Sequence, residues 1–167
     1  MATVEASNLD FLYKSIVPVK PFKIAILTAK WNWEITGKLM EGAEEYLNSC
    51  GDIEIVKHFV PGAYELTIGA QKLAQQASID AVVTLGCVIK GDTFHFDYIC
   101  QAVAQGISNV GLKYDKPIIF GVLTTNTIQQ AIDRAGGVHG NKGAEAAATA
   151  VQVLNEFLVE KKGRIGF

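Results

Sequence analysis

A threonine and a histidine follow a buried apolar run in the middle of the chain. Leu85–Ile89 is predicted to be a strand, Gly91 a turn, and Thr93 and His95 the start of a helix. In α/β proteins such a junction is where ligands bind, because the free N–H groups of a helix start attract anions. An imidazole there can exchange protons near neutral pH, so His95 is the candidate acid–base residue. The alternative for a single histidine is a core residue whose hydrogen bonds are satisfied.

Similar chemistry follows two other apolar runs. Trp31 comes after the first of them, and Tyr64 and Glu65 come after the second. Because the carboxyl ends of parallel strands meet at one edge of a sheet, these side chains are expected to share a crevice with His95. Such a crevice suits a flat, polar, partly anionic small molecule. The structural alternatives are that Trp31 covers the core and that Glu65 complements a helix dipole.

Residues 133–143 combine glycines with Arg134 and Lys142 ahead of the last predicted helix. Glycines and cations near a helix start can hold a phosphate, although neither a Walker A loop nor a Gly-x-Gly-x-x-Gly motif is present. The alternative is a flexible loop with solvated charges. His58 and His139 lack partners at the spacing of metal ligands, so no metal site is predicted.

These residues need a sheet and helices to position them. Val-, Ile- and Leu-rich runs predict strands, and stripes with helical spacing predict helices. Their alternation predicts a three-layer α/β/α sandwich, flavodoxin-like, with four parallel strands and helices on both faces. The strands are expected over Phe22–Ala29, Ile53–Val60, Ala81–Ile89 and Pro117–Thr125, and the helices over Glu34–Cys50, Tyr64–Ala77, Thr93–Leu112, Thr127–Ala135 and Lys142–Lys161, with Gly51 just after the first helix.

The length of 167 residues fits one domain, predicted over 22–167 after an N-terminal arm, 1–21. Within the arm, Ser15–Val19 could form a short strand, and Pro18 and Pro21 would restrict it to a sheet edge. The arm has two alternatives at this point. It either folds back on its own domain or adds a strand to a neighbour.

The composition narrows the classes of protein. A net charge of −2 argues against nucleic acid as a partner, and no apolar run is long enough for a membrane span. The N-terminus lacks the pattern of a signal peptide, and the three cysteines are odd in number without metal spacing. Reduced thiols in a cytoplasmic protein are therefore expected. A mean hydropathy of +0.21 favours a homo-oligomer, in which other subunits cover apolar surface.

In combination, the junction motifs resemble those of the lumazine synthase family, from Phe22 to the last helix. The matching motifs are Trp31-Asn32, Val60–Glu65, Val88–Tyr98, Phe120–Thr125, Asp133–Gly136 and Gly140–Gly143. The resemblance implies a transferase of riboflavin biosynthesis. It would condense 5-amino-6-(D-ribitylamino)uracil with 3,4-dihydroxy-2-butanone 4-phosphate to 6,7-dimethyl-8-ribityllumazine, through a Schiff base, phosphate elimination and ring closure. No cofactor and no metal are implied.

The resemblance also implies roles for single residues. Trp31 would stack on the pyrimidine, Phe120 would cover it, and His95 would donate a proton. Arg134 would bind the phosphate, with Lys142 as a further substrate-binding residue. The pocket for the ribityl-bearing substrate would be formed by Ala63, Tyr64, Glu65, Cys87, Val88 and Ile89, and the phosphate pocket would be lined by Asp92 and Thr93.

The implied assembly is a pentamer whose sites lie between adjacent subunits, with Phe120 and Arg134 supplied by the neighbour. Many members build an icosahedral shell of twelve pentamers. The absence of an insertion at Gly136–Gly143 favours the shell over a free pentamer. Riboflavin synthase is a further partner that the resemblance suggests.

One residue departs from the family pattern in a way that matters. Asp92 stands where a small residue is common, and its carboxylate would repel a phosphate unless the side chain turns away. Lys90 replaces a common Arg, and Trp31 a common Phe, without loss of the implied roles. Two other functions are kept as alternatives. One is a flavin- or lumazine-binding module without turnover, and the other is a shell protein whose main task is encapsulation.

Overall fold

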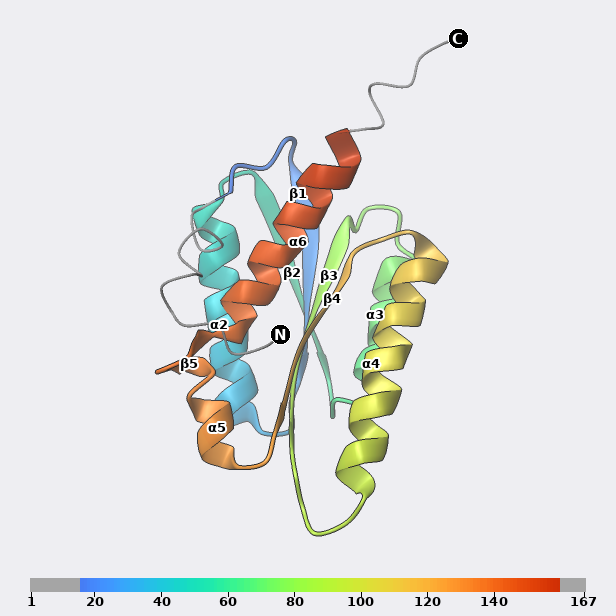
Figure 1. The fold of residues 1–167 in the computed structure, drawn as a ribbon. Helices are drawn as coiled ribbons and strands as arrows, with labels where there is room; N and C mark the ends of the chain where they lie inside the picture. The colour runs from blue at the N-terminus through green and yellow to red at the C-terminus, as the bar shows by residue number, and fades with distance from the viewer. Residues whose placement is uncertain (1–15, 160–167) are drawn as a thin grey trace.

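A computed structural model describes residues 16–159 of the chain. Its centre is a parallel four-stranded sheet in the order β2-β1-β3-β4 (Figure 1). All four strands run in the same direction, so that their carboxyl ends lie at the bottom of that view, where the loop after β3 reaches furthest. The strands are β1 (Phe22–Ala29), β2 (Ile53–Val60), β3 (Ala81–Ile89) and β4 (Ile118–Thr125).

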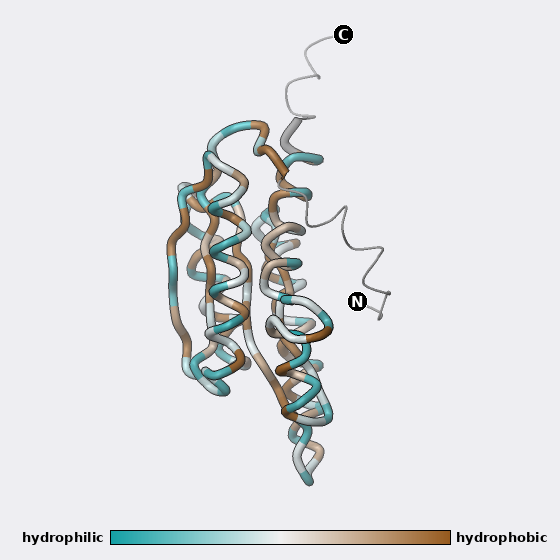
Figure 2. The backbone as a smooth tube through the Cα atoms, turned by 90° about the vertical axis from the view of Figure 1, so that its left-hand side faces the viewer, coloured by the Kyte–Doolittle hydropathy of each residue, from teal (hydrophilic) through white to brown (hydrophobic). Residues whose placement is uncertain are grey.

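Helices cover both faces of the sheet and make two separate cores. The helices are α2 (Trp33–Ser49), α3 (Leu66–Ala74), α4 (His95–Tyr114), α5 (Ile128–Ile132) and α6 (Lys142–Val159). One core joins α2, α5 and α6 to strand residues such as Ile24, Ile26 and Leu85. The other joins α3 and α4 to Leu27 and Val82. Apolar and polar residues alternate along the helices (Figure 2), as expected where one stripe faces a core.

The predicted sandwich is confirmed. Three strands have the predicted bounds, and the fourth begins one residue later, after Pro117. Gly51 follows α2 with φ of 94°, the left-handed conformation that a side chain would disfavour. Among the helices, α3 is shorter than predicted at both ends. Helix α5 begins one residue later than predicted, because the hydroxyl of Thr127 accepts a hydrogen bond from the N–H of Gln130 and makes Thr127 the N-cap.

The prediction that α5 continues to Ala135 is wrong. Residues Ala135–Gly137 form a short strand, β5, which pairs antiparallel with β6 (Gly140–Asn141). Gly136 and Gly140 have φ of 101° and 73°, so glycine permits this hairpin. The segment predicted as a loop between helices is therefore a fixed turn that leads directly into α6.

The described part of the arm, from residue 16, is not a strand. The side chain of Asn155 on α6 accepts a hydrogen bond from the N–H of Val19 and donates one to the carbonyl of Val17, both at 3.0 Å. An amide side chain thus replaces a partner strand and fixes the root of the arm on α6. Ser15 and the residues before it lie outside the described part. Within residues 16–159, no helix is long and apolar enough to cross a membrane.

Candidate functional site

The loop after β1 lies at the carboxyl edge of the sheet, beside the junction after β2. The N–H of Lys30 donates to the carbonyl of Val60 and that of Trp31 to the carbonyl of Pro61, each at 2.9 Å. The Trp31 ring lies against Gly62, where an added Cβ would come within 2.7 Å of the ring. Its side chain is nevertheless 67% exposed. Because Gly62 has no side chain, the Trp31 ring can pack against its backbone and still remain open to a ligand.

Asn32 ties this loop to the next strand. Its backbone is left-handed, with φ of 58° and ψ of 43°, a conformation that costs a non-glycine residue about 1 kcal/mol. Its side-chain amide donates to the carbonyl of Cys87 at 2.9 Å. Asn32 was not predicted as a site residue, although the Trp31-Asn32 pair was part of the family motif.

The junction after β2 lies next to this loop. A carboxylate oxygen of the half-buried Glu65 accepts a hydrogen bond from the N–H of Gly62 at 3.0 Å. Ala63 is buried beneath, and Tyr64 is 59% exposed. Glu65 is therefore held near Trp31, with its other oxygen available for a hydroxyl-rich ligand.

The end of β3 is the third segment at this edge of the sheet, and Asn32 contacts it. Val88 and Ile89 are half-buried, whereas Cys87 is buried, and burial raises the pKa of its thiol to about 11. A thiol of that pKa is protonated at neutral pH, so Cys87 contributes shape and a backbone carbonyl to this segment and is a poor nucleophile.

The loop after β3 is open to solvent. Asp92, Thr93 and His95 are all exposed, and the Thr93 hydroxyl accepts a long 3.4 Å hydrogen bond from the N–H of His95. His95 is the first residue of α4, two residues later than the predicted helix start at Thr93. The carboxylate of Asp92 sits on an exposed bend, where water can solvate its charge.

A second cluster of predicted site residues lies at β4. Phe120, Arg134 and Lys142 line a cavity of about 290 Å³, together with Thr125 and Gln130. Arg134 donates through Nη1 to the carbonyl of Gln130 at 3.0 Å, which orients its guanidinium. The hydroxyl of Thr125 is buried without a hydrogen-bond partner in the described part of the chain. The cavity thus combines the cations of Arg134 and Lys142, a lining that suits an oxyanion, whereas the Thr125 hydroxyl is too buried to reach a ligand.

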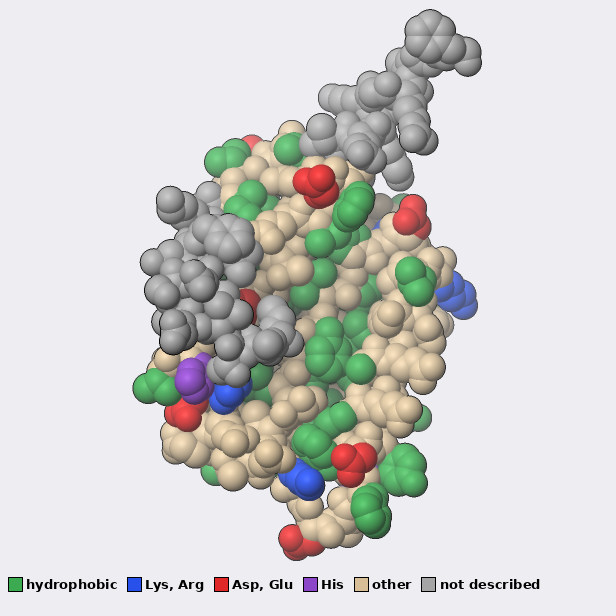
Figure 3. Space-filling model, in the orientation of Figure 1, with side chains coloured by type: hydrophobic (Ala, Val, Ile, Leu, Met, Phe, Trp, Pro, Cys, Tyr) green, Lys and Arg blue, Asp and Glu red, His purple; other side chains and the backbone are tan. Residues whose placement is uncertain are grey.

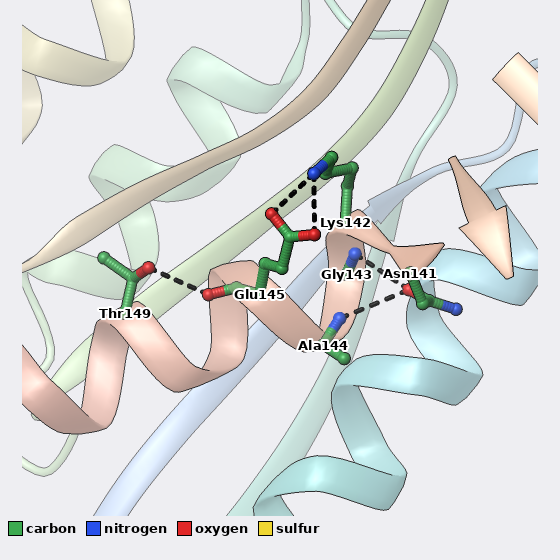
Figure 4. A network of polar contacts seen from close by, with 6 residues as sticks. All are labelled: Asn141, Lys142, Gly143, Ala144, Glu145 and Thr149. Atoms are coloured by element: carbon green, nitrogen blue, oxygen red, sulfur yellow. Dashed lines mark hydrogen bonds and ion pairs between the residues drawn. The ribbon is translucent and has the colours of Figure 1, made fainter. Parts of the chain in front are cut away.

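Lys142 is held by a carboxylate that the sequence reasoning missed. Its Nζ lies 2.6 and 2.8 Å from the two carboxylate oxygens of Glu145, which is only 4% exposed (Figure 4). Thr149 donates to the backbone carbonyl of Glu145 at 2.8 Å. The spacing of Lys142 and Glu145 could have predicted this ion pair, because residues three apart on a helix lie on the same face.

The start of α6 is built from two residues of the Gly140–Gly143 motif. Asn141 accepts hydrogen bonds from the N–H groups of Gly143 and Ala144 at 2.8 and 3.2 Å (Figure 4). It also donates to the carbonyl of Lys38 on α2 at 2.8 Å. Gly143 packs so closely on α2 that an added Cβ would collide with the carbonyl oxygen of Leu39. Lys142 is therefore placed by a capped helix start clamped onto α2.

The structure separates the predicted site residues into two groups. Trp31, Glu65 and His95 follow β1, β2 and β3, but none of them lines the cavity at β4. Phe120 is the third residue of β4, which continues to Thr125 as predicted, and it is exposed on this edge strand. In residues 16–159, no group of three His, Cys, Asp or Glu side chains could hold a metal ion.

Comparisons with known proteins agree on one family. Residues 21–157 match the family model of 6,7-dimethyl-8-ribityllumazine synthase. The enzyme of that name from Parabacteroides distasonis is 49% identical over 157 residues, covering 93% of this chain and 98% of the relative. That from Porphyromonas gingivalis is 50% identical, covering 92% and 96%, and that from Cytophaga hutchinsonii is 56% identical, covering 77% and 82%.

Proposed function

Because the chain belongs to the 6,7-dimethyl-8-ribityllumazine synthase family, we propose that the two groups of residues described above are the two halves of its active site. The enzyme condenses 5-amino-6-(D-ribitylamino)uracil with 3,4-dihydroxy-2-butanone 4-phosphate, with release of phosphate and water. The amine attacks the ketone to form a Schiff base, phosphate leaves, and the ring closes. A binding module without turnover is no longer needed to explain the aromatic residues.

The half formed by β1, β2 and β3 takes the pyrimidine. Trp31 stacks on the ring, and the free oxygen of Glu65 accepts hydrogen bonds from ribityl hydroxyls. Tyr64 flanks the ribityl chain, while Ala63, Cys87, Val88 and Ile89 give the pocket its shape. The exposed flat face of Trp31 over Gly62 is the observation that supports this assignment most directly.

The half at β4 takes the phosphate. Arg134 can bind it through two parallel N–H bonds and stay bound as negative charge builds on the leaving group. Lys142 adds charge, although Glu145 offsets part of it. Phe120 covers the pyrimidine from this side, and the backbone of Asp92 and the hydroxyl of Thr93 reach the phosphate from the other half.

His95 moves protons during addition, elimination and dehydration. Replacing it with alanine is expected to lower kcat about tenfold, because a positioned imidazole is replaced by water that already reaches this exposed position. The KM values for both substrates should change little. Steady-state kinetics with each substrate varied in turn measures this, and an unchanged kcat would remove His95 from the mechanism. His139→Ala, on the β5–β6 turn, is the matched control.

We infer that the two halves meet across a subunit interface. In residues 16–159, none of Trp31, Glu65 and His95 lines the cavity that holds Arg134, and a second copy would bring Arg134 of one chain to His95 of another. Head-to-tail contacts of this kind close into rings. A pentamer, with the arm of each chain reaching its neighbour, is the assembly we propose.

The free edge of β4 supports this assembly. No other strand within residues 16–159 pairs with its outer side, and residues 118–125 carry no charge that would discourage another strand. An apolar hollow of about 650 Å³ lies beside it, between α4 and α6, lined by residues such as Ile118, Leu154 and Phe157 (Figure 3). The exposed Val17 and Val19 at the root of the arm support this proposal, because apolar side chains gain by burial against an apolar surface.

Mixed oligomers test the shared site. If His95→Ala and Arg134→Ala chains are unfolded together and reassembled, about one site in four should combine two unaltered halves and regain activity. Each variant reassembled alone is the control. Activity no greater than the mean of the two controls would mean that both halves belong to the same chain.

We propose further that twelve pentamers form a shell in the cytoplasm, with riboflavin synthase as a partner. The β5–β6 hairpin turns through Val138 and His139 alone, so it has no bulk to block contacts between pentamers. The three cysteines are free thiols in the structure, as a reducing compartment allows.

A further inference from the structure

The side chain of Asn32 is used in an unusual way for its position. Asn32 is the N-cap residue of α2, and its carbonyl accepts hydrogen bonds from the N–H groups of Ile35 and Thr36 at 2.8 and 3.0 Å. Asparagine is favoured at N-caps because its side-chain oxygen can accept from the first turn. Here the side chain makes no such cap bond. Its amide points across the sheet edge to Cys87 instead.

The hydrogen bond replaces a missing part of the sheet. The ladder between β1 and β3 ends at the pair Thr28 and Leu85, but β3 continues to Ile89. Beyond that pair, the β1 side of β3 has no neighbouring strand. The Asn32 amide donates to the carbonyl of Cys87 there, 55 residues along the chain. It thereby fixes the end of β3, Cys87–Ile89, next to the loop of Trp31.

The same residue determines where Trp31 lies. The left-handed turn at Asn32 directs the chain from the loop after β1 into α2. The N–H of Trp31 donates to the carbonyl of Pro61. Trp31 is therefore held from both sides, by β2 through its own backbone and by β3 through Asn32. In the described residues, only Asp115 is also a non-glycine residue with positive φ, and it lies at the far end of α4.

We propose that Asn32 is a positioning residue for the pyrimidine substrate. By joining the loop of Trp31 to the end of β3, it sets the spacing between the aromatic face and the Cys87–Ile89 segment, and a flat ring must fit between them. This inference rests on the proposed role of Trp31. It concerns binding of the pyrimidine and leaves proton transfer and phosphate binding unaffected.

Asn32→Gly is the direct test, because glycine keeps the left-handed backbone and removes only the amide. We expect the KM for the pyrimidine to rise about tenfold, the effect of losing one hydrogen bond, with kcat and the KM for the phosphate substrate within about twofold of the parent. Asn32→Asp should raise the KM at least as much, because its carboxylate cannot donate to Cys87. Asp115→Gly, the matched control, relieves a left-handed residue far from the site and should leave all three constants unchanged.

A spectroscopic readout separates positioning from stability. In a Trp33→Phe background, only Trp31 fluoresces, and Asn32→Gly should lower its anisotropy and weaken its quenching by the pyrimidine. An unchanged pyrimidine KM in Asn32→Gly, or a loss of thermal stability without a change in that KM, would overturn the inference. Trp31→Ala tests the proposed pyrimidine site separately from the role of Asn32. If it leaves the pyrimidine KM unchanged, the proposed site fails, and if it alone raises that KM, only the role of Asn32 fails.

Discussion

Arg134→Ala is expected to raise the KM for the phosphate substrate about a hundredfold, with a much smaller effect on the KM for the pyrimidine. Hydrogen bonds to a charged group contribute about 1.5–3 kcal/mol each, and a guanidinium makes two of them to a phosphate. The cavity keeps Lys142 after the change, but Glu145 already engages its ammonium at 2.6 Å. The remaining cation therefore compensates poorly.

Inhibition by inorganic phosphate is a second measurement of phosphate binding. Inorganic phosphate should inhibit the parent enzyme in competition with the phosphate substrate, and this inhibition should weaken in Arg134→Ala by a similar factor. Arg134→Lys should recover part of the loss, since lysine supplies charge without the planar pair of donors. Gln129→Ala is the control, because Gln129 bonds to Asp133 and does not line the cavity. Equal effects of Arg134→Ala and Gln129→Ala would refute the assignment of phosphate to this cavity.

Gly143→Ala is expected to destabilise the folded protein by about 3 kcal/mol, the upper range for overpacking of a core. The added Cβ would meet the main-chain carbonyl of Leu39, which cannot rotate away as a side chain could. Helix α6 would have to move off α2, and the hydrogen bond from Asn141 to Lys38 would be stretched.

Urea unfolding at a fixed protein concentration measures this loss, with concentration fixed because assembly adds to apparent stability. Gly91→Ala is the matched control. A Cβ at Gly91 would meet nothing within 4 Å, so its effect should stay within about 0.5 kcal/mol. If both variants unfold at the same urea concentration as the parent, the close contact between α2 and α6 does not limit the packing.

The sheet and its helices could be predicted from the sequence because their signals are local. Phe22–Ala29 and Ala81–Ile89 are apolar along nearly their whole length, as strands covered on both faces must be. The β5–β6 hairpin could not be predicted this way. Its two strands contain five residues, three of them glycine, without an apolar alternation, and their pairing depends on positive φ at Gly136 and Gly140.

The candidate site was predictable in its residue types and less so in its geometry. The strand-to-helix junctions identify Trp31, Glu65 and His95, because parallel strands must end at one edge. The ion pair between Lys142 and Glu145 and the amide bond from Asn32 to Cys87 depend on side-chain directions that no local pattern encodes. The exposure of Phe120 was not predictable either, because an apolar run does not mark which strand lies at the edge of the sheet.

The open edge of β4 also bears on how the chain is made. A protomer that has folded but not yet met another copy carries an uncharged strand edge beside an apolar hollow, which is a template for aggregation. If the chain assembles as proposed above, covering this edge depends on how fast the protomer meets other copies, so low expression leaves the edge exposed longer. Selection on this gene would therefore act on the amount and timing of protein produced, in addition to the chemistry of the site.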